Sequence, residues 1–179
     1  MNNPIGRTAG PGQVISLTRR SAWRREYEMR AGDRALGWLR WRPGRRSAAQ
    51  AEGPGMGLID VAARRRRVVV AGAGGAEILA TVDRGRDGSV IHTIEGHVLA
   101  WERTAPRNHW AVREQGRTLL AVAASQGLLR SSAQISVEQT MPEHTAALLA
   151  LIGGYLALSE LQYEADLAAA TAAAAAGSG

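Results

Sequence analysis

The sequence of 179 residues contains no lysine, no cysteine and no phenylalanine, so all 22 basic residues are arginine. The lack of cysteine excludes a disulfide scaffold, zinc sites with thiolate ligands and a cysteine nucleophile. Arginine in place of every lysine, with abundant alanine and glycine, is typical of a GC-rich bacterial genome. Part of the isoelectric point of about 11.1 therefore reflects composition rather than function.

The chain also lacks a long hydrophobic run and a secretory signal. Residues 1–13 contain no apolar stretch and are expected to form a flexible leader. The longest apolar run, residues 146–158, has 13 residues, whereas a helix that spans a bilayer needs about 20. We therefore predict no transmembrane span and a protein that is cytoplasmic, either free or peripheral to a membrane.

The positive charge is concentrated in the first third of the chain. Residues 1–67 hold 15 Arg against 5 Asp or Glu, a net charge of +10, while residues 68–179 have a net charge of −4. Codon bias does not segregate charge of one sign along a chain, so the asymmetry calls for a structural reason. At 45% hydrophobic residues the chain is not a disordered tail.

Residues 22–140 alternate between apolar and polar side chains. Tyr27 and Met29, for example, alternate with Glu26 and Glu28. Turns rich in glycine or proline interrupt this pattern about every 8–12 residues, which is typical of an antiparallel meander, sandwich or barrel. Eleven candidate strands are predicted, at residues 23–30, 35–42, 47–52, 57–62, 66–71, 76–83, 89–94, 97–103, 108–114, 117–124 and 133–139.

At about residues 142–165 the spacing of apolar residues changes from the alternation of a strand to the period of a helix. Apolar side chains cover every side of this helix, as expected for a helix buried inside a protein. A closed sheet of ten to twelve strands encloses more space than its own side chains fill. We therefore predict a mainly β protein, with one domain over residues 14–165, an antiparallel closed barrel around a hydrophobic C-terminal helix, and an Ala-rich tail over residues 166–179. The predicted core residues of the helix are Leu148, Leu149, Ile152, Tyr155 and Leu156.

Residues 143–161 (EHTAALLALIGGYLALSEL) and short strands such as residues 34–42 (RALGWLRWR) resemble the tubby C-terminal-like fold. Tubby proteins, phospholipid scramblases and LURP-one-related proteins share this fold, and the resemblance covers about residues 22–161. It implies a closed barrel around a hydrophobic C-terminal helix. The tubby branch implies phosphoinositide binding through basic surface residues. The scramblase branch implies a membrane-associated helix and palmitoylated cysteines, which this chain lacks.

The arginines of the first third are the candidate binding residues. A surface of this kind suits an anionic membrane lipid or an acidic protein. Because Trp23, Tyr27, Trp38 and Trp41 lie near them in sequence, nucleic acid is the alternative partner, with phosphates bound by arginine and bases stacked on the rings. A third interpretation is that the arginines are solvated and the aromatic rings belong to the core. The candidate anion-binding residues are Arg45, Arg46, Arg64, Arg65, Arg66 and Arg67.

No pattern in the sequence indicates catalysis, a cofactor or a metal. The glycine-rich residues 68–77 end in Glu77 where a dinucleotide fingerprint needs its third glycine, which favours a hairpin turn. His92, His97 and Glu95 offer fewer than the four ligands of a structural zinc site. The sequence therefore predicts a non-catalytic binding or scaffold module without cofactor or metal, and an enzyme stays a third hypothesis that no set of residues supports.

Overall fold

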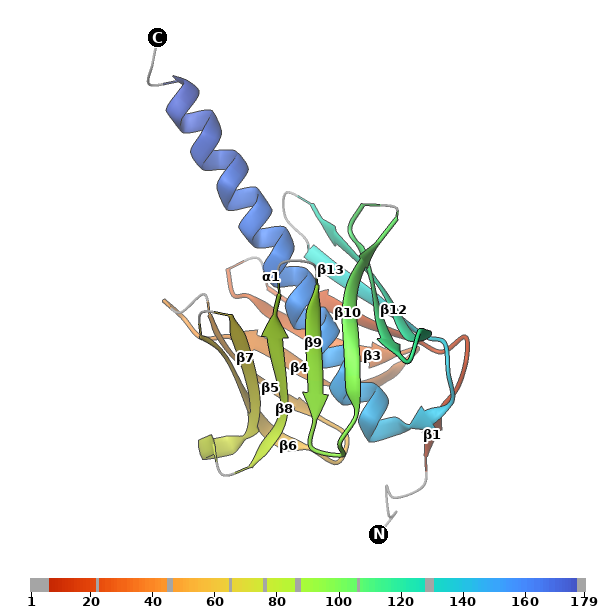
Figure 1. The fold of residues 1–179 in the computed structure, drawn as a ribbon. Helices are drawn as coiled ribbons and strands as arrows, with labels where there is room; N and C mark the ends of the chain where they lie inside the picture. Colours follow the sequence, from red (N-terminus) through yellow and green to blue (C-terminus); the bar gives the residue numbers. More distant parts are fainter. Residues whose placement is uncertain are drawn as a thin grey trace.

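In the computed structural model, twelve antiparallel strands close into a barrel and one long helix runs through its centre (Figure 1). This arrangement confirms the predicted fold class. The structure describes residues 7–21, 23–44, 47–64, 66–75, 77–85, 88–105, 107–127 and 131–176. The elements are β1 (Thr8–Ala9), β2 (Val14–Arg19), β3 (Glu26–Ala31), β4 (Arg34–Trp41), β5 (Ala48–Gly53), β6 (Gly57–Arg64), β7 (Arg67–Gly72), the 3₁₀ helix η1 (Ala73–Gly75), β8 (Ile78–Arg84), β9 (Ser89–Thr93), β10 (Val98–Thr104), β11 (His109–Glu114), β12 (Arg117–Gln126), β13 (Ser131–Val137), β14 (Met141–Pro142) and α1 (Glu143–Ala176).

Strand β2 closes the barrel, and the sequence analysis missed it. The strands from β2 to β13 pair in chain order, and β2 pairs with β13 through the registered residues Ile15 and Ile135. Ile15 and Leu17 are buried, while Ser16 and Thr18 alternate with them on the other face. This alternation was present in the sequence, but it begins before the region that was assigned to strands.

The inner faces of the strands and the first half of α1 form one hydrophobic core. Leu149, Ile152, Tyr155 and Leu156 are each no more than 2% exposed, whereas Leu148 is only partly buried. The two glycines in the middle of the helix let it fit inside the barrel. A Cβ atom on Gly153 would lie 3.3 Å from Trp101 Cζ3, and one on Gly154 would lie 3.1 Å from Leu17 Cδ1.

Helix α1 is longer than the sequence analysis predicted. It begins at Glu143, next to the predicted start, but it continues through the Ala-rich tail to Ala176. Leu161 is the last of its buried residues, and residues 167–176 are exposed beyond the barrel (Figure 1). The helix has the length and hydropathy of a membrane span, but 72% of its apolar window is buried inside the protein.

The end of the barrel where α1 begins is sealed by the N-terminal segment. Strand β1 pairs with β14, Ala9 is 1% exposed, and the Glu143 amide donates to the Arg7 carbonyl. Within the expected leader of residues 1–13, these contacts hold part of residues 7–13 against the barrel, and residues 1–6 lie outside the described residues. The Arg34 guanidinium also pairs with the carboxylate of Glu143, a residue that is only 8% exposed.

Candidate anion-binding site

Charge divides between the two ends of the barrel. Successive strands are antiparallel, so alternate loops lie at the same end. We call the end where α1 begins the closed end, and the end where α1 leaves the barrel the open end. In the part of the chain that the structure describes, the inter-strand loops of the open end hold arginines and neither Asp nor Glu; those of the closed end hold Asp or Glu and no arginine. The open-end residues are Arg20, Arg24, Arg25, Arg42, Arg66 and Arg107, and the closed-end residues are Asp33, Glu77, Glu95 and Glu138.

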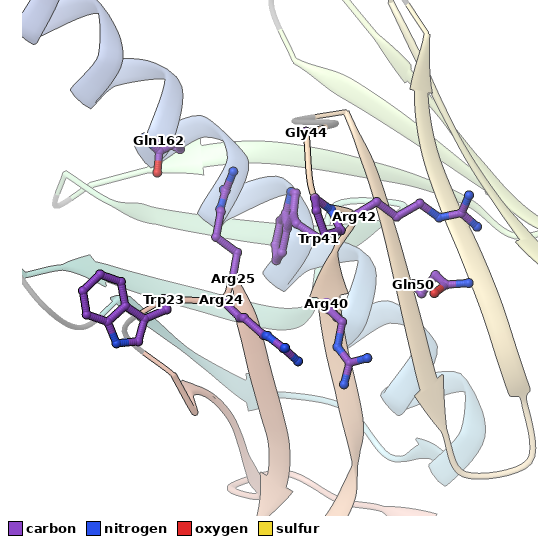
Figure 2. Close-up of a pocket in the computed structure, with 10 residues that line it drawn as sticks. Trp23, Arg24, Arg25, Arg40, Trp41, Arg42, Gly44, Gln50 and Gln162 are labelled. Atoms are coloured by element: carbon purple, nitrogen blue, oxygen red, sulfur yellow. The ribbon is translucent and has the colours of Figure 1, made fainter.

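A pocket of about 760 Å³ lies at the open end, beside β3, β4 and β5. Figure 2 shows Arg24 reaching toward Arg40, and Arg25 standing beside the ring of Trp41. The described residues that line the pocket include no Asp or Glu. They are Trp23, Arg24, Arg25, Arg40, Trp41, Arg42, Pro43, Gly44, Gln50 and Gln162. We call this the arginine pocket.

Trp41 links the arginine pocket to the hydrophobic core. One face of its ring stacks on Tyr155, with 5.4 Å between ring centroids, and the Arg25 guanidinium lies 4.7 Å from its centroid. Trp41 is 5% exposed, and its indole Nε1 has no hydrogen-bond acceptor among the described residues. The pocket wall therefore contains a buried donor without a partner, a costly state for a polar atom.

Two of the pocket arginines are held by carboxylates outside the lining. Arg40 pairs with Glu26 at 3.0 Å, and this contact, aided by the more distant Arg20 and Arg24, lowers the pKa of the Glu26 carboxyl. Arg42 pairs with Asp60 at 2.5 Å. Burial raises the pKa of Asp60, but hydrogen bonds from Gln50 and Arg42 outweigh it and bring the pKa below its ordinary value.

The loop between β2 and β3 supplies the remaining positive charge of the pocket. Ser21 Oγ accepts hydrogen bonds from the backbone amides of Trp23 and Arg24, each at 3.3 Å. Arg19 Nε donates to the Ser21 carbonyl at 2.9 Å. The Arg24 guanidinium interacts electrostatically with the Glu26 carboxyl, and Trp23 is 96% exposed. The loop therefore presents a cation and an exposed indole at the pocket.

A second pocket of about 510 Å³ adjoins the first where α1 leaves the barrel. Arg25 and Gln162 line both pockets, so the two surround the exit of the helix. Arg84 and Tyr155 also line the second pocket, and burial raises the pKa of the Tyr155 hydroxyl. Glu160, Glu164 and Asp166 of α1 line the second pocket as well, so the carboxylates of the open end lie on the helix beside the second pocket and not in the arginine pocket.

Of the six predicted anion-binding residues, the structure describes three, Arg64, Arg66 and Arg67, which lie at the open end but not in the arginine pocket. Arg45, Arg46 and Arg65 lie outside the described residues. Arg64, Arg66 and Arg67 are exposed on the β6–β7 hairpin, and Arg67 pairs with Asp83 at 2.6 Å. None of these three lines the pocket.

The pocket arginines are instead Arg24, Arg25, Arg40 and Arg42, which the sequence analysis did not assign as binding residues. The available signal was a turn segment, residues 20–25, that contains three arginines and no acid. The prediction followed the contiguous arginines of residues 64–67, whereas the arginines of the pocket come from two separate segments, residues 24–25 and residues 40–42.

Nucleic-acid binding, the alternative hypothesis, needs exposed aromatic rings on which bases can stack, but most of the four aromatic residues near the arginines have other roles. Tyr27 and Trp41 are buried, and Trp38 Nε1 donates to Glu52 Oε2 at 3.0 Å. Of these four candidates, only Trp23 is broadly exposed. The interpretation of core aromatic residues thus applies to Tyr27 and Trp41.

The other candidate motifs do not form sites. Residues 68–77 belong to the β7–η1–β8 hairpin, as the turn interpretation predicted. His92 lies 3.8 Å from Asp83, while Glu95 lies between His97, at 3.7 Å, and His144, at 3.2 Å. The described ranges contain no group of three or more His, Asp or Glu side chains that could hold a metal ion.

Comparison with family models, with curated proteins and with solved structures finds no match for this chain. The fold and the open end together define an antiparallel barrel around a core helix, with an arginine-lined pocket at the helix exit.

Proposed function

We propose that this chain is a non-catalytic, tubby-like binding module that recognises phosphate-bearing anions, including lipid headgroups, at its open end. The observation that carries the proposal is the arginine pocket, where four guanidinium groups gather without a lining carboxylate. The closed barrel and its hydrophobic core helix support the tubby-like assignment. On this proposal the module acts in the cytoplasm, either free or at a membrane surface.

The chemistry of the pocket suits phosphate oxygens. A guanidinium group donates two parallel hydrogen bonds to a phosphate and stays charged at every physiological pH. Arg24 and Arg25, the latter stacked over the ring of Trp41, bring the number of guanidinium groups that line the pocket to four. Because Arg40 and Arg42 are fixed by Glu26 and Asp60, part of the pocket is ordered before a ligand binds.

Nucleic acid is the weaker candidate because binding of single strands relies on several exposed rings that stack on successive bases. Trp23 is the one broadly exposed ring among the four aromatic candidates. An acidic protein would use the same arginines, so a comparison of probes is needed to separate it from phosphate.

The direct test is calorimetric titration of the full chain with inorganic tripolyphosphate. The double variant Arg24→Gln/Arg25→Gln should bind at least about tenfold more weakly, because each charge-assisted hydrogen bond contributes about 1.5–3 kcal/mol. The matched control is Arg113→Gln/Arg117→Gln, which removes two positive charges from the strand ends nearest the closed end. This control should bind tripolyphosphate like the unaltered chain.

Two outcomes would overturn the proposal. The first is no binding of tripolyphosphate by the unaltered chain at low salt. The second is equal weakening in the pocket and control variants, since that would indicate general charge attraction rather than a site. Stronger binding of a single-stranded oligonucleotide or an acidic peptide than of tripolyphosphate would favour the corresponding alternative partner.

A further inference from the structure

The last part of α1 is an exposed helix without charge. Residues 167–176 consist of Leu167, one threonine and eight alanines, and all of them are exposed. We call these residues the tail segment. It projects from the open end of the barrel, away from the N-terminus (Figure 1). In water such a segment leaves apolar surface uncovered on every side, so a partner that covers it is favoured.

The base of the tail segment carries aromatic and basic side chains. Tyr163 is 70% exposed on the helix, and Trp23 is 96% exposed on the adjoining loop of the open end. The loops at the same end of the barrel hold arginines such as Arg24 and Arg66. Tryptophan and tyrosine gather at the level of lipid headgroups, and arginine near a membrane is attracted to anionic lipids.

We infer that the open end docks on an anionic lipid bilayer, with the tail segment inserted among the acyl chains and Trp23 and Tyr163 at headgroup level. The inference rests on the proposed function, because the arginine pocket then receives phosphate groups of the lipid headgroups. It adds the source of the anion and the orientation of the barrel, with the open end toward the bilayer.

The length of the tail segment fits one leaflet. Ten helical residues rise about 15 Å, and the hydrocarbon core of a bilayer is about 30 Å thick. The tail segment therefore reaches about the middle of the bilayer without crossing it. The preceding part of α1 stays in the barrel, where Leu158 and Leu161 are buried.

Three carboxylates of α1 lie near the helix exit, and the arginine partners of one of them, Glu164, offset its charge against an anionic surface. Glu160 accepts hydrogen bonds from Trp101 Nε1 at 3.2 Å and from Trp110 Nε1 at 2.8 Å. Glu164 pairs with Arg103 at 2.8 Å and with Arg107 at 3.6 Å. Asp166 accepts a hydrogen bond from Gln162 at 2.9 Å.

A second copy of the chain fits the tail segment less well than a membrane does. If two tail segments paired side by side in antiparallel fashion, the two open ends would face each other. If they paired in parallel, the two open ends would lie next to each other and face the same way. In either arrangement the arginines of the open-end loops of both copies would lie in the same region, and the described residues of these loops contain no Asp or Glu. Like charges repel, whereas an anionic bilayer attracts the same loops.

The test compares binding of the full chain to vesicles of phosphatidylcholine alone and of phosphatidylcholine with phosphatidylserine, by co-sedimentation. The key variant is Ala170→Glu/Ala174→Lys. This change keeps the net charge and places a favourable ion pair at positions i and i+4, so the helix is retained. Charged residues are expelled from hydrocarbon, and we expect binding to the anionic vesicles to fall at least about tenfold.

The control for this variant is the soluble probe. Ala170→Glu/Ala174→Lys should bind inorganic tripolyphosphate like the unaltered chain, because the tail segment does not line the arginine pocket. If neither tripolyphosphate nor vesicles bind, the proposed function fails. If tripolyphosphate binds but vesicles do not, or if the tail variant binds vesicles as well as the unaltered chain, the membrane inference alone is overturned.

A spectroscopic measurement reports the predicted position of Trp23. With anionic vesicles whose acyl chains are brominated near the headgroup, Trp23 fluorescence should be quenched, and the quenching should disappear in Trp23→Phe. Unchanged quenching in Trp23→Phe would contradict the orientation. Self-association without lipid in sedimentation velocity that Ala170→Glu/Ala174→Lys abolishes would assign the tail segment to a second copy and overturn the inference.

Discussion

The closed and open ends of the barrel are made by the same strands but serve different purposes. At the closed end, strand β1 covers the start of α1 and the Arg34–Glu143 ion pair fastens the helix to β4. Turns such as residues 32–33 and 115–116 are short there. At the open end, loops such as residues 20–25 are longer and two pockets surround the helix. Arginine predominates in the first pocket, whereas Glu160, Glu164 and Asp166 also line the second.

The difference shows how an antiparallel barrel can separate stability from binding. Alternate loops meet at the same end, so arginines from distant segments gather there while strand pairing stays intact. At the closed end, Arg34 pairs with the buried carboxylate of Glu143, because a buried charge without a partner is strongly destabilising. Substitutions at the closed end should thus change stability, and substitutions at the open end should change binding.

The largest effect is expected from Ile152→Asp, midway along the buried part of α1. Ile152 is 1% exposed, and an unpaired charge there should cost more than about 4 kcal/mol and disrupt both ends together. Circular dichroism with urea unfolding measures this loss. The control Ile152→Val should cost about 1 kcal/mol. A soluble Ile152→Asp variant that unfolds at the urea concentration of the unaltered chain would contradict the role of α1 as the core.

A smaller loss is expected when the closed end is opened by Arg34→Ala. Glu143 is 8% exposed, so its carboxylate would be left without its partner, while the Arg34 side chain is 42% exposed and solvent moderates the cost. We expect about 2 kcal/mol less stability and faster hydrogen exchange in residues 7–13. Arg113→Ala, which removes the more exposed pair with Glu102, should cost about 0.5 kcal/mol or less. Equal losses of stability in Arg34→Ala and Arg113→Ala would show that the Arg34–Glu143 pair matters no more than an exposed ion pair.

The acid response should depend on the two carboxylates that hold the pocket arginines. The folded-state pKa values of Glu26 and Asp60 are lowered, so their stabilisation is complete above the ordinary carboxyl pKa values of 4.5 and 3.8 and is lost as pH falls through the lowered values. As the pH drops below about 4.5, the unfolding free energy of Glu26→Gln/Asp60→Asn should fall by about 1 kcal/mol less than that of the unaltered chain. Identical pH profiles for the variant and the unaltered chain, from urea unfolding at each pH, would refute this.

The smallest change in stability is expected at the open end itself. Arg24→Gln/Arg25→Gln removes the stacking of Arg25 on Trp41, a loss of about 0.5 kcal/mol, although the same variant should lose tripolyphosphate binding. A thermal unfolding curve measures the stability. A loss comparable to that of Arg34→Ala would show that the open end also holds the fold together.

Sequence alone predicted most of the strands because alternation of apolar and polar residues reports directly on a half-buried sheet. It missed β2, whose alternating Ile15 and Leu17 follow a segment that was assigned to a leader. It placed the central helix at about residues 142–165 and left the structure of the Ala-rich tail open, since an alanine run shows no amphipathic pattern although alanine favours helix.

The candidate site was less predictable than the fold. Clustering along the sequence pointed to Arg64 and its neighbours, yet cross-strand neighbours decide which arginines share a pocket. Arg40 reaches the pocket because Glu26 lies opposite it in the β3–β4 register. Such a pairing depends on register and loop length, which composition does not report.

By itself, the sequence determined a closed mainly β barrel with an apolar C-terminal helix, because periodicity and burial are local properties of the chain. Tertiary structure decided that the charge asymmetry of the two sequence segments becomes an asymmetry of the two barrel ends. It also decided that Trp41 is a buried pocket wall and Trp23 an exposed ring. Both outcomes depend on where the strands reverse, because each reversal sends the next loop to the opposite end.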